Sequence, residues 1–125
     1  MPKVLVIDDD EMVLALVQHI LNLEGFETLT TADGPQGLAL FKERRPDIVL
    51  LDLALPGMNG LEVLRRIRQI DQNAKVIVVT GSGSDESAQV ATQYGAIDFV
   101  RKPVDYAEFV KRIRAALPED GPARR

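Results

Sequence analysis

The 125-residue sequence contains no cysteine and only one histidine. Without cysteine it can form neither a disulfide framework nor a thiolate metal site, and this absence fits a reducing compartment. The histidine, His19, falls on a predicted helix away from the ends of the predicted strands. We therefore expect it on the surface rather than in a Ser-His-Asp triad or a metal site. Any metal ligands should be oxygen atoms.

Long hydrophobic runs and an excess of positive charge are missing too. The first apolar run, at positions 4–7, stops at Asp8, far short of a signal peptide or a membrane span. The formal net charge is -4, so the domain lacks the basic surface that binds nucleic acid. We expect a cytoplasmic protein that contacts neither membrane nor nucleic acid directly.

The hydrophobic pattern that is present predicts one α/β domain. Short apolar runs typical of strands alternate with stretches at helical spacing, which gives five strand–helix units without an internal repeat. This order favours a doubly wound parallel sheet covered by helices on both faces. We assign 1–117 to this domain and 118–125 to a tail or linker. Strands are expected at 4–7, at 27–31, between Asp47 and Asp52, at 76–80 and at 97–100.

The predicted helices have distinct inner and outer faces. In the first helix, Leu16 is expected to face the core, together with Val13, Val17 and Ile20. In the third, the arginines at 65, 66 and 68 are expected on the solvent side. Asp10 is expected to cap the first helix rather than to bind a metal.

Polar residues follow most of the predicted strands. In open parallel sheets, sites form where the carboxyl ends of the strands meet. Each residue has a plain alternative explanation on its own, as a helix cap, a β-former or a solvated charge. Their joint placement at one edge predicts a site made of Asp8, Asp9, Asp52, Thr80 and Lys102.

These residue types point to phosphoryl transfer. Converging carboxylates repel one another unless a cation neutralises them, and an all-oxygen ligand set favours Mg²⁺. A lysine and a hydroxyl donor beside the metal can stabilise the charge on a phosphoryl group. A carboxylate can itself be the nucleophile and form an aspartyl phosphate.

In these residues the chain resembles the receiver domains of two-component response regulators, from Val4 to about Leu117. The resemblance implies a flavodoxin-like (βα)5 sandwich with strand order 2-1-3-4-5, acting as a signalling domain rather than an enzyme, although it assists its own phosphorylation and dephosphorylation. The matching motifs are Val-Ile-Asp8-Asp9-Asp10, Leu-Leu-Asp52 with Pro56-Gly57-Met58-Asn59-Gly60, Thr80-Gly81, and Gly95 to Pro103.

The resemblance also implies a role for each site residue. Asp52 would accept a phosphoryl group from a sensor histidine kinase or phosphotransfer protein, and Thr80 and Lys102 would contact the phosphoryl oxygens. Mg²⁺, with Mn²⁺ as a substitute, would be held by Asp9, Asp52 and the backbone carbonyl of Ala54, with Asp8 orienting metal-bound water. The Lys102–Pro103 bond would be cis.

A switch is implied as well. Phosphorylation would draw the Thr80 hydroxyl inward and the Phe99 ring would follow, which would remodel the face of the fourth helix, fifth strand and fifth helix for an unknown output partner. Asp98 and Arg112 match positions used for dimerisation in one receiver subfamily. Because Ala88 and Tyr94 replace other members of that charge set, a homodimer stays open.

Small residues flank the predicted phosphorylation site at Ala54 and Ser82, where the family often has larger ones. We expect a phosphoryl group that is open to water and therefore short-lived. Three alternatives remain at this point: an aspartate-nucleophile phosphatase of the haloacid-dehalogenase type that uses Asp8, a flavin-binding module, and a pseudo-receiver that serves only for interaction. Whether the domain stands alone or belongs to a longer protein also stays open.

Overall fold

The computed structural model describes residues 1–81 and 85–117. Ser82 and the proposed tail at 118–125 lie outside these described residues. Strands and helices alternate along the chain in the predicted manner: β1 Lys3–Ile7, α1 Glu11–Leu23, β2 Glu27–Thr31, α2 Gly34–Arg44, β3 Ile48–Leu51, α3 Gly60–Ile70, β4 Val76–Thr80, α4 Asp85–Gln93, β5 Asp98–Arg101 and α5 Tyr106–Ala116.

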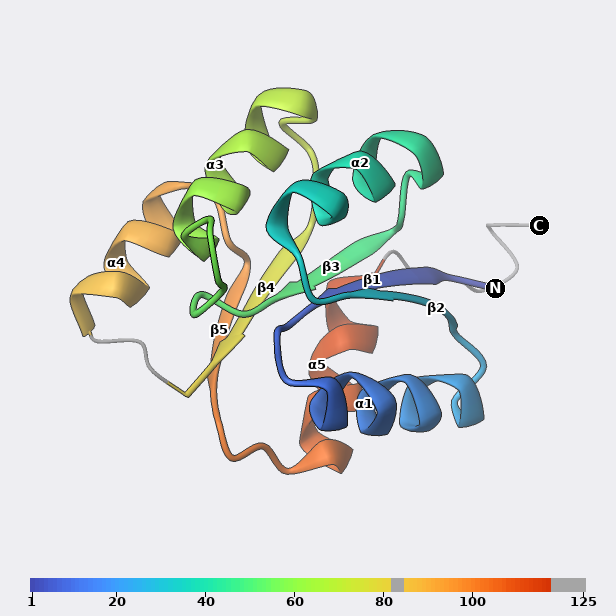
Figure 1. Cartoon of the computed structure of the whole chain (residues 1–125). Helices are drawn as coiled ribbons and strands as arrows, with labels where there is room; N and C mark the ends of the chain where they lie inside the picture. Colours follow the sequence, from blue (N-terminus) through green and yellow to red (C-terminus); the bar gives the residue numbers. More distant parts are fainter. Residues whose placement is uncertain (82–84, 118–125) are drawn as a thin grey trace.

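The strands form one parallel sheet with the order β2-β1-β3-β4-β5. Helices α1 and α5 cover one face, and α2, α3 and α4 cover the other (Figure 1). The doubly wound three-layer fold and its strand order are therefore confirmed. None of the helices in the described ranges is long and apolar enough to cross a membrane.

The hydrophobic core has two halves, one on each face of the sheet. Successive side chains of a strand point to opposite faces. In β1, Leu5 and Ile7 therefore pack towards α2 and α3, whereas Val4 and Val6 pack towards α1 and α5. All four are buried, as are all residues of β3 and β4, which explains why these strands are continuous apolar runs in the sequence.

The three consecutive acids after β1 separate into different environments. Asp8 is buried and Asp9 is exposed. The Asp10 carboxylate accepts hydrogen bonds from the backbone N–H groups of Met12 and Val13, so it caps α1 as predicted. Only the first two of these acids are thus available to the predicted site.

Two predictions about helix faces are wrong. Leu16 is 45% exposed and lies on the outer side of α1 with Met12 (82%) and Leu23 (73%), since α1 has more apolar residues than its inner face can bury. Arg68 does not extend into solvent. Its guanidinium turns back over the end of α3 and donates hydrogen bonds to the backbone carbonyls of Gln72, Ala74, Tyr94 and Gly95.

Candidate functional site

The sheet itself brings the site residues together. Asp52 follows β3, and its N–H donates to the Ile7 carbonyl of β1 at 2.9 Å. Lys102 follows β5, and its N–H donates to the Thr80 carbonyl of β4 at 3.0 Å. The hydrogen-bond ladder thus continues one residue past the strands, so the site residues lie next to one another at the carboxyl edge, as predicted.

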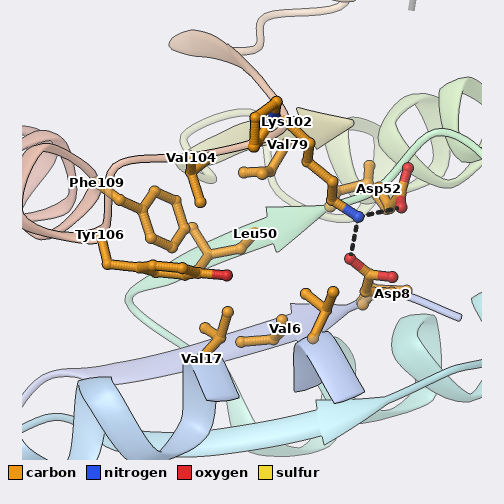
Figure 2. Close-up of a pocket in the computed structure, with 14 residues that line it drawn as sticks. Val6, Asp8, Val17, Leu50, Asp52, Val79, Lys102, Val104, Tyr106 and Phe109 are labelled. Carbon is orange, nitrogen blue, oxygen red and sulfur yellow. Dashed lines mark hydrogen bonds and ion pairs between the residues drawn. The ribbon is translucent and has the colours of Figure 1, made fainter. Parts of the chain in front are cut away.

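Lys102, which follows β5, forms ion pairs with the two carboxylates that follow β1 and β3. Its ammonium lies 2.7 Å from Asp8 Oδ2 and 2.9 Å from Asp52 Oδ2 (Figure 2). The two carboxylate side chains are 5% and 6% exposed, whereas the lysine side chain is 23% exposed. Charge-assisted hydrogen bonds of this length are stronger than neutral ones. The predicted lysine is therefore in contact with the predicted phosphoacceptor.

Asp52 is held as an anion. Burial alone would raise the pKa of its carboxyl group, but hydrogen bonds from the Ala54 N–H, Lys102 and Thr80 outweigh burial and lower this pKa below its ordinary value. The Ala54 N–H contacts Oδ1 at 3.0 Å, so Oδ1 and Oδ2 both have donors. An ionised carboxylate is the form that can act as a nucleophile.

The pKa of Asp8 is shifted in the opposite direction to that of Asp52. Burial raises the pKa of Asp8, and the opposing hydrogen bonds from Lys102 and the Asp10 N–H do not fully compensate. Burial opposes the charged form of Lys102 as well, but its hydrogen bonds to both carboxylates raise its pKa. Two neighbouring acids are thus shifted in opposite directions, which is a feature of functional sites.

The acids also suit a hard cation. One carboxylate oxygen from each of Asp8, Asp9 and Asp52 lies within 4.8 Å of the others. Three carboxylates face a single ammonium, so the cluster has more negative charge than Lys102 neutralises. Mg²⁺ prefers oxygen ligands and needs only one or two carboxylates because it keeps several waters. The ligand set predicted from the sequence therefore lies in one place.

Gly60, for which the sequence predicted no role, lets the start of α3 lie close to the loop after Asp52. A Cβ at Gly60 would overlap Leu53 Cα and lie 2.5 Å from the carbonyl oxygen of Asp52. The Gly60 N–H donates to the Leu53 carbonyl at 3.0 Å. Only glycine lets the start of α3 approach this loop so closely. The signal was present in the sequence as the Asn59-Gly60 pair at the start of the helix.

The predicted switch residues lie on adjacent strands. Phe99 is opposite Val78 and Arg101 is opposite Thr80 in the β4–β5 register. The Phe99 ring is half-buried against the core half beneath α2, α3 and α4, and the Arg101 guanidinium lies 5.3 Å from its centroid. Thr80 and Phe99 therefore face the same side of the sheet, although their coupling stays a prediction.

Two further predicted features are the Lys102–Pro103 peptide bond and the Asp98–Arg112 pair. The Lys102–Pro103 peptide bond is cis. Asp98 and Arg112 form an ion pair within the chain, with Arg112 Nη1 at 2.8 Å from Asp98 Oδ1. Both side chains are partly exposed, so this pair lies on the surface between β5 and α5.

Comparisons with known proteins agree with this geometry. Residues 4–114 match the family described as the response regulator receiver domain. Sporulation initiation phosphotransferase F of Bacillus subtilis is 37% identical over 116 residues, which cover 93% of this chain and 94% of that protein. The DNA-binding response regulator MtrA of Mycolicibacterium smegmatis is 41% identical over 123 residues. The match covers 97% of this chain but 54% of MtrA, so the chain spans about half the length of that relative.

Solved structures of similar fold include two receiver proteins. A CheY-like receiver domain protein from Methanospirillum hungatei superposes with a TM-score of 0.90 at 30% identity, over 92% of each chain. A Borrelia burgdorferi chain from a CheX–CheY–BeF3–Mg²⁺ complex has a TM-score of 0.87 at 32% identity, over 91% of this chain and 87% of that one. The chain therefore belongs to the response regulator receiver domain family, a family of signalling domains that act in phosphorelays through a phosphorylated aspartate.

Proposed function

We propose that Asp52 is the phosphorylated aspartate of this domain and that it receives the phosphoryl group from a phosphohistidine of a sensor histidine kinase or phosphotransfer protein. The observation that carries the proposal is the set of donors around this one carboxylate. Its oxygens contact the Ala54 N–H and Lys102, and Thr80 adds a third hydrogen bond. Asp8 also contacts Lys102, but its other donor is the Asp10 N–H, and Thr80 bonds Asp52 instead.

The transfer forms one bond and breaks one bond. An Asp52 carboxylate oxygen attacks the phosphorus atom, the phosphorus–nitrogen bond to the donor imidazole breaks, and the imidazole keeps the electron pair and later takes a proton from water. The Lys102 ammonium and the Thr80 hydroxyl then contact the oxygens of the transferred group. When water attacks the same phosphorus, the aspartyl phosphate returns to carboxylate and inorganic phosphate. By placing Lys102 and Thr80 against the phosphoryl oxygens, the domain would assist both its phosphorylation and its dephosphorylation.

Asp9 and Asp52 would hold Mg²⁺ together with the Ala54 backbone carbonyl, with Asp8 beside them, and Mn²⁺ would occupy the same ligands. The bound ion supplies positive charge that offsets the negative charge of the phosphoryl oxygens. The proximity of the three carboxylates supports this assignment. Asp8, as the most buried of the acids and the one bonded to Lys102, would keep the ammonium and the metal-bound water in position.

The output would come from the face formed by α4, β5 and α5. Movement of the Thr80 hydroxyl towards the phosphoryl group leaves room for Phe99 to turn inward, away from Arg101. The partly exposed Asp98–Arg112 pair on this face could exchange partners between two copies, which would give a phosphorylation-dependent homodimer. Residues 1–117 would form the receiver domain, which would act on an output domain or on a separate output protein. A phosphohistidine donor would place the domain in the cytoplasm.

A macromolecular phosphodonor also has a surface to bind. The stripe of Met12, Leu16 and Leu23 on the outer side of α1 is apolar and exposed. It begins close to Asp8 in the chain, at the same edge of the sheet as the site (Figure 1). Large exposed apolar patches mark protein-binding surfaces, and these three side chains would form the apolar part of such a surface. We assign this stripe, hereafter the α1 stripe, to the donor protein.

Asp52→Asn tests the central assignment. The variant should take up no phosphoryl group from acetyl phosphate and Mg²⁺, as measured by intact mass spectrometry. Borohydride reduction, which converts an aspartyl phosphate to homoserine, should mark position 52 in the wild-type protein. Asp10→Asn is the matched control, because Asp10 caps α1 and is not in the metal-ligand cluster. Full labelling of Asp52→Asn, or homoserine at position 8, would refute the assignment and favour the phosphatase alternative.

A further inference from the structure

A cavity lies directly beneath the site, on the face of the sheet covered by α1 and α5. Its volume is about 250 Å³. One end is formed by Asp8, Asp52 and Lys102, and the rest extends between the two helices (Figure 2). It is a pocket partly open to solvent rather than an enclosed void, so a small molecule can enter it without opening of the sheet.

The walls away from the site are apolar. The sheet contributes Val6, Leu50 and Val79, and α1 contributes Val13 and Val17. Apolar cavities of about 150 Å³ stay dry and bind benzene or xenon, because too few polar atoms face any water inside them. This cavity is larger than that, although it is smaller than most pockets for drug-sized molecules. It fits a compact molecule of one or two rings.

The segment that enters α5 supplies the features that select a ligand. Tyr106 and Phe109 line the cavity and pack edge to face, with ring centroids 6.3 Å apart and an interplanar angle of 77°. In Figure 2 the Tyr106 hydroxyl points across the cavity. No residue in the described ranges forms a hydrogen bond with this hydroxyl, so it remains available to a bound molecule.

We propose that this cavity is a binding site for a small uncharged aromatic molecule that carries one polar atom. The apolar walls favour the rings, the two aromatic side chains favour edge-to-face packing, and the Tyr106 hydroxyl bonds the polar atom. A charged ligand is disfavoured, because an ion between the apolar walls of the cavity loses its hydration. The carboxylates at the cavity end are already bonded to Lys102.

Ligand binding should be coupled to the phosphorylation site. Lys102 contributes to both, since its ammonium bonds Asp52 while the residue lines the cavity with Pro103 and Val104. A change in the Lys102 position on phosphorylation would therefore change the cavity. By linkage, a bound molecule shifts the phosphorylation equilibrium by the same factor by which phosphorylation shifts its affinity. This coupling rests on the proposed function of Asp52, whereas the binding itself does not.

Indole is a suitable probe because it has two fused rings and one N–H donor. We expect saturable binding with a dissociation constant of about 1 mM, followed by amide chemical shifts at Val17, Val79 and Tyr106 in a nitrogen-labelled sample. Val17→Phe should fill the cavity and weaken binding at least about tenfold, as should Val104→Phe from the opposite wall. The matched control is Ala15→Phe, which adds a ring at an exposed position of the same helix and should leave the affinity unchanged.

The outcomes separate the two parts of the proposal. The proposed binding site is refuted if indole binding does not saturate, or if both filled variants bind indole with the same affinity as the wild type. If either filled variant unfolds, the other one and the Ala15→Phe control decide. Repeating the titration with beryllofluoride and Mg²⁺ should change the dissociation constant about fivefold. An unchanged constant in a sample that demonstrably binds beryllofluoride overturns the coupling, whereas failure to bind beryllofluoride contradicts the proposed function alone.

Discussion

Lys102 Nζ lies 2.7 Å from Asp8 Oδ2, which connects residues that are 94 positions apart in the chain. Despite this contact, burial keeps the pKa of Asp8 above its ordinary value. The folded protein therefore binds a proton at Asp8 at a higher pH than the unfolded chain does. Ionised Asp8 lowers the free energy of unfolding at neutral pH, and this penalty disappears as the pH falls through the raised pKa.

Asp8→Asn should therefore make the metal-free protein more stable at neutral pH, by about 1 kcal/mol in urea unfolding with a chelator present. The gain should shrink as the solution is acidified. Asp52→Asn gives the opposite sign, because the lowered pKa of Asp52 means that its ionised form stabilises the fold above the ordinary pKa. A variant Asp8→Asn that is less stable than wild type at neutral pH would contradict this interpretation of the buried acid.

Arg68→Ala should loosen the contact between α3 and the end of α4. The guanidinium donates to four backbone carbonyls, including Tyr94 at 3.1 Å and Gly95 at 2.8 Å. Its loss should cost about 2 kcal/mol of unfolding free energy and speed amide exchange around Gly95. Arg66→Ala is the matched control on the same helix, because Arg66 is exposed and pairs with Glu62. Equal effects of the two substitutions would show that the carbonyl contacts contribute nothing.

Ala54→Met should lengthen the life of the phosphorylated state. Ala54 is exposed beside Asp52, so its small side chain leaves the phosphoryl group open to water. A larger side chain should slow hydrolysis at least about threefold, or by about 0.6 kcal/mol in the barrier. Phosphate release after removal of acetyl phosphate measures this rate, and Ala15→Met on the exposed side of α1 is the control. A wild-type phosphoprotein that lasts many hours would overturn the idea.

Leu16→Glu tests the α1 stripe. It places a charge in the centre of the exposed apolar stripe and should slow transfer from a phosphorylated donor protein about tenfold, because apolar contact area is lost. Labelling by acetyl phosphate should not change, since Leu16 does not line the site. Parallel time courses with the two donors give the comparison. If both slow equally, the substitution damages the fold rather than the contact.

Much of this domain is predictable from its sequence because the decisive signals are local. The run between Asp47 and Asp52 is apolar because β3 is buried on both faces, and a parallel sheet must collect its strand ends at one edge. Those two facts are enough to bring Asp8, Asp52 and Lys102 together.

The wrong and missing predictions concern contacts that a local pattern does not contain. Arg68 has the spacing of a solvent-facing residue, but its partners at 94 and 95 are brought to it only by the packing of α4. Leu16 suits an inner face by spacing, yet α1 has room for only part of its apolar residues. The cavity under the site depends on how two helices from opposite ends of the chain pack, so it too had no sequence signal.

The backbone of the site is part of the sheet, because the amides of Asp52 and Lys102 donate to carbonyls of the neighbouring strands. These amides exchange with solvent only after their hydrogen bonds to the neighbouring strands open, so the phosphoacceptor and the lysine keep their positions while the ends of those strands stay paired. Phosphorylation consequently adds its charge to a fixed frame. The conformational signal must therefore spread through side-chain rotations and through the helices on the two faces, because these do not belong to the hydrogen-bond ladder of the sheet.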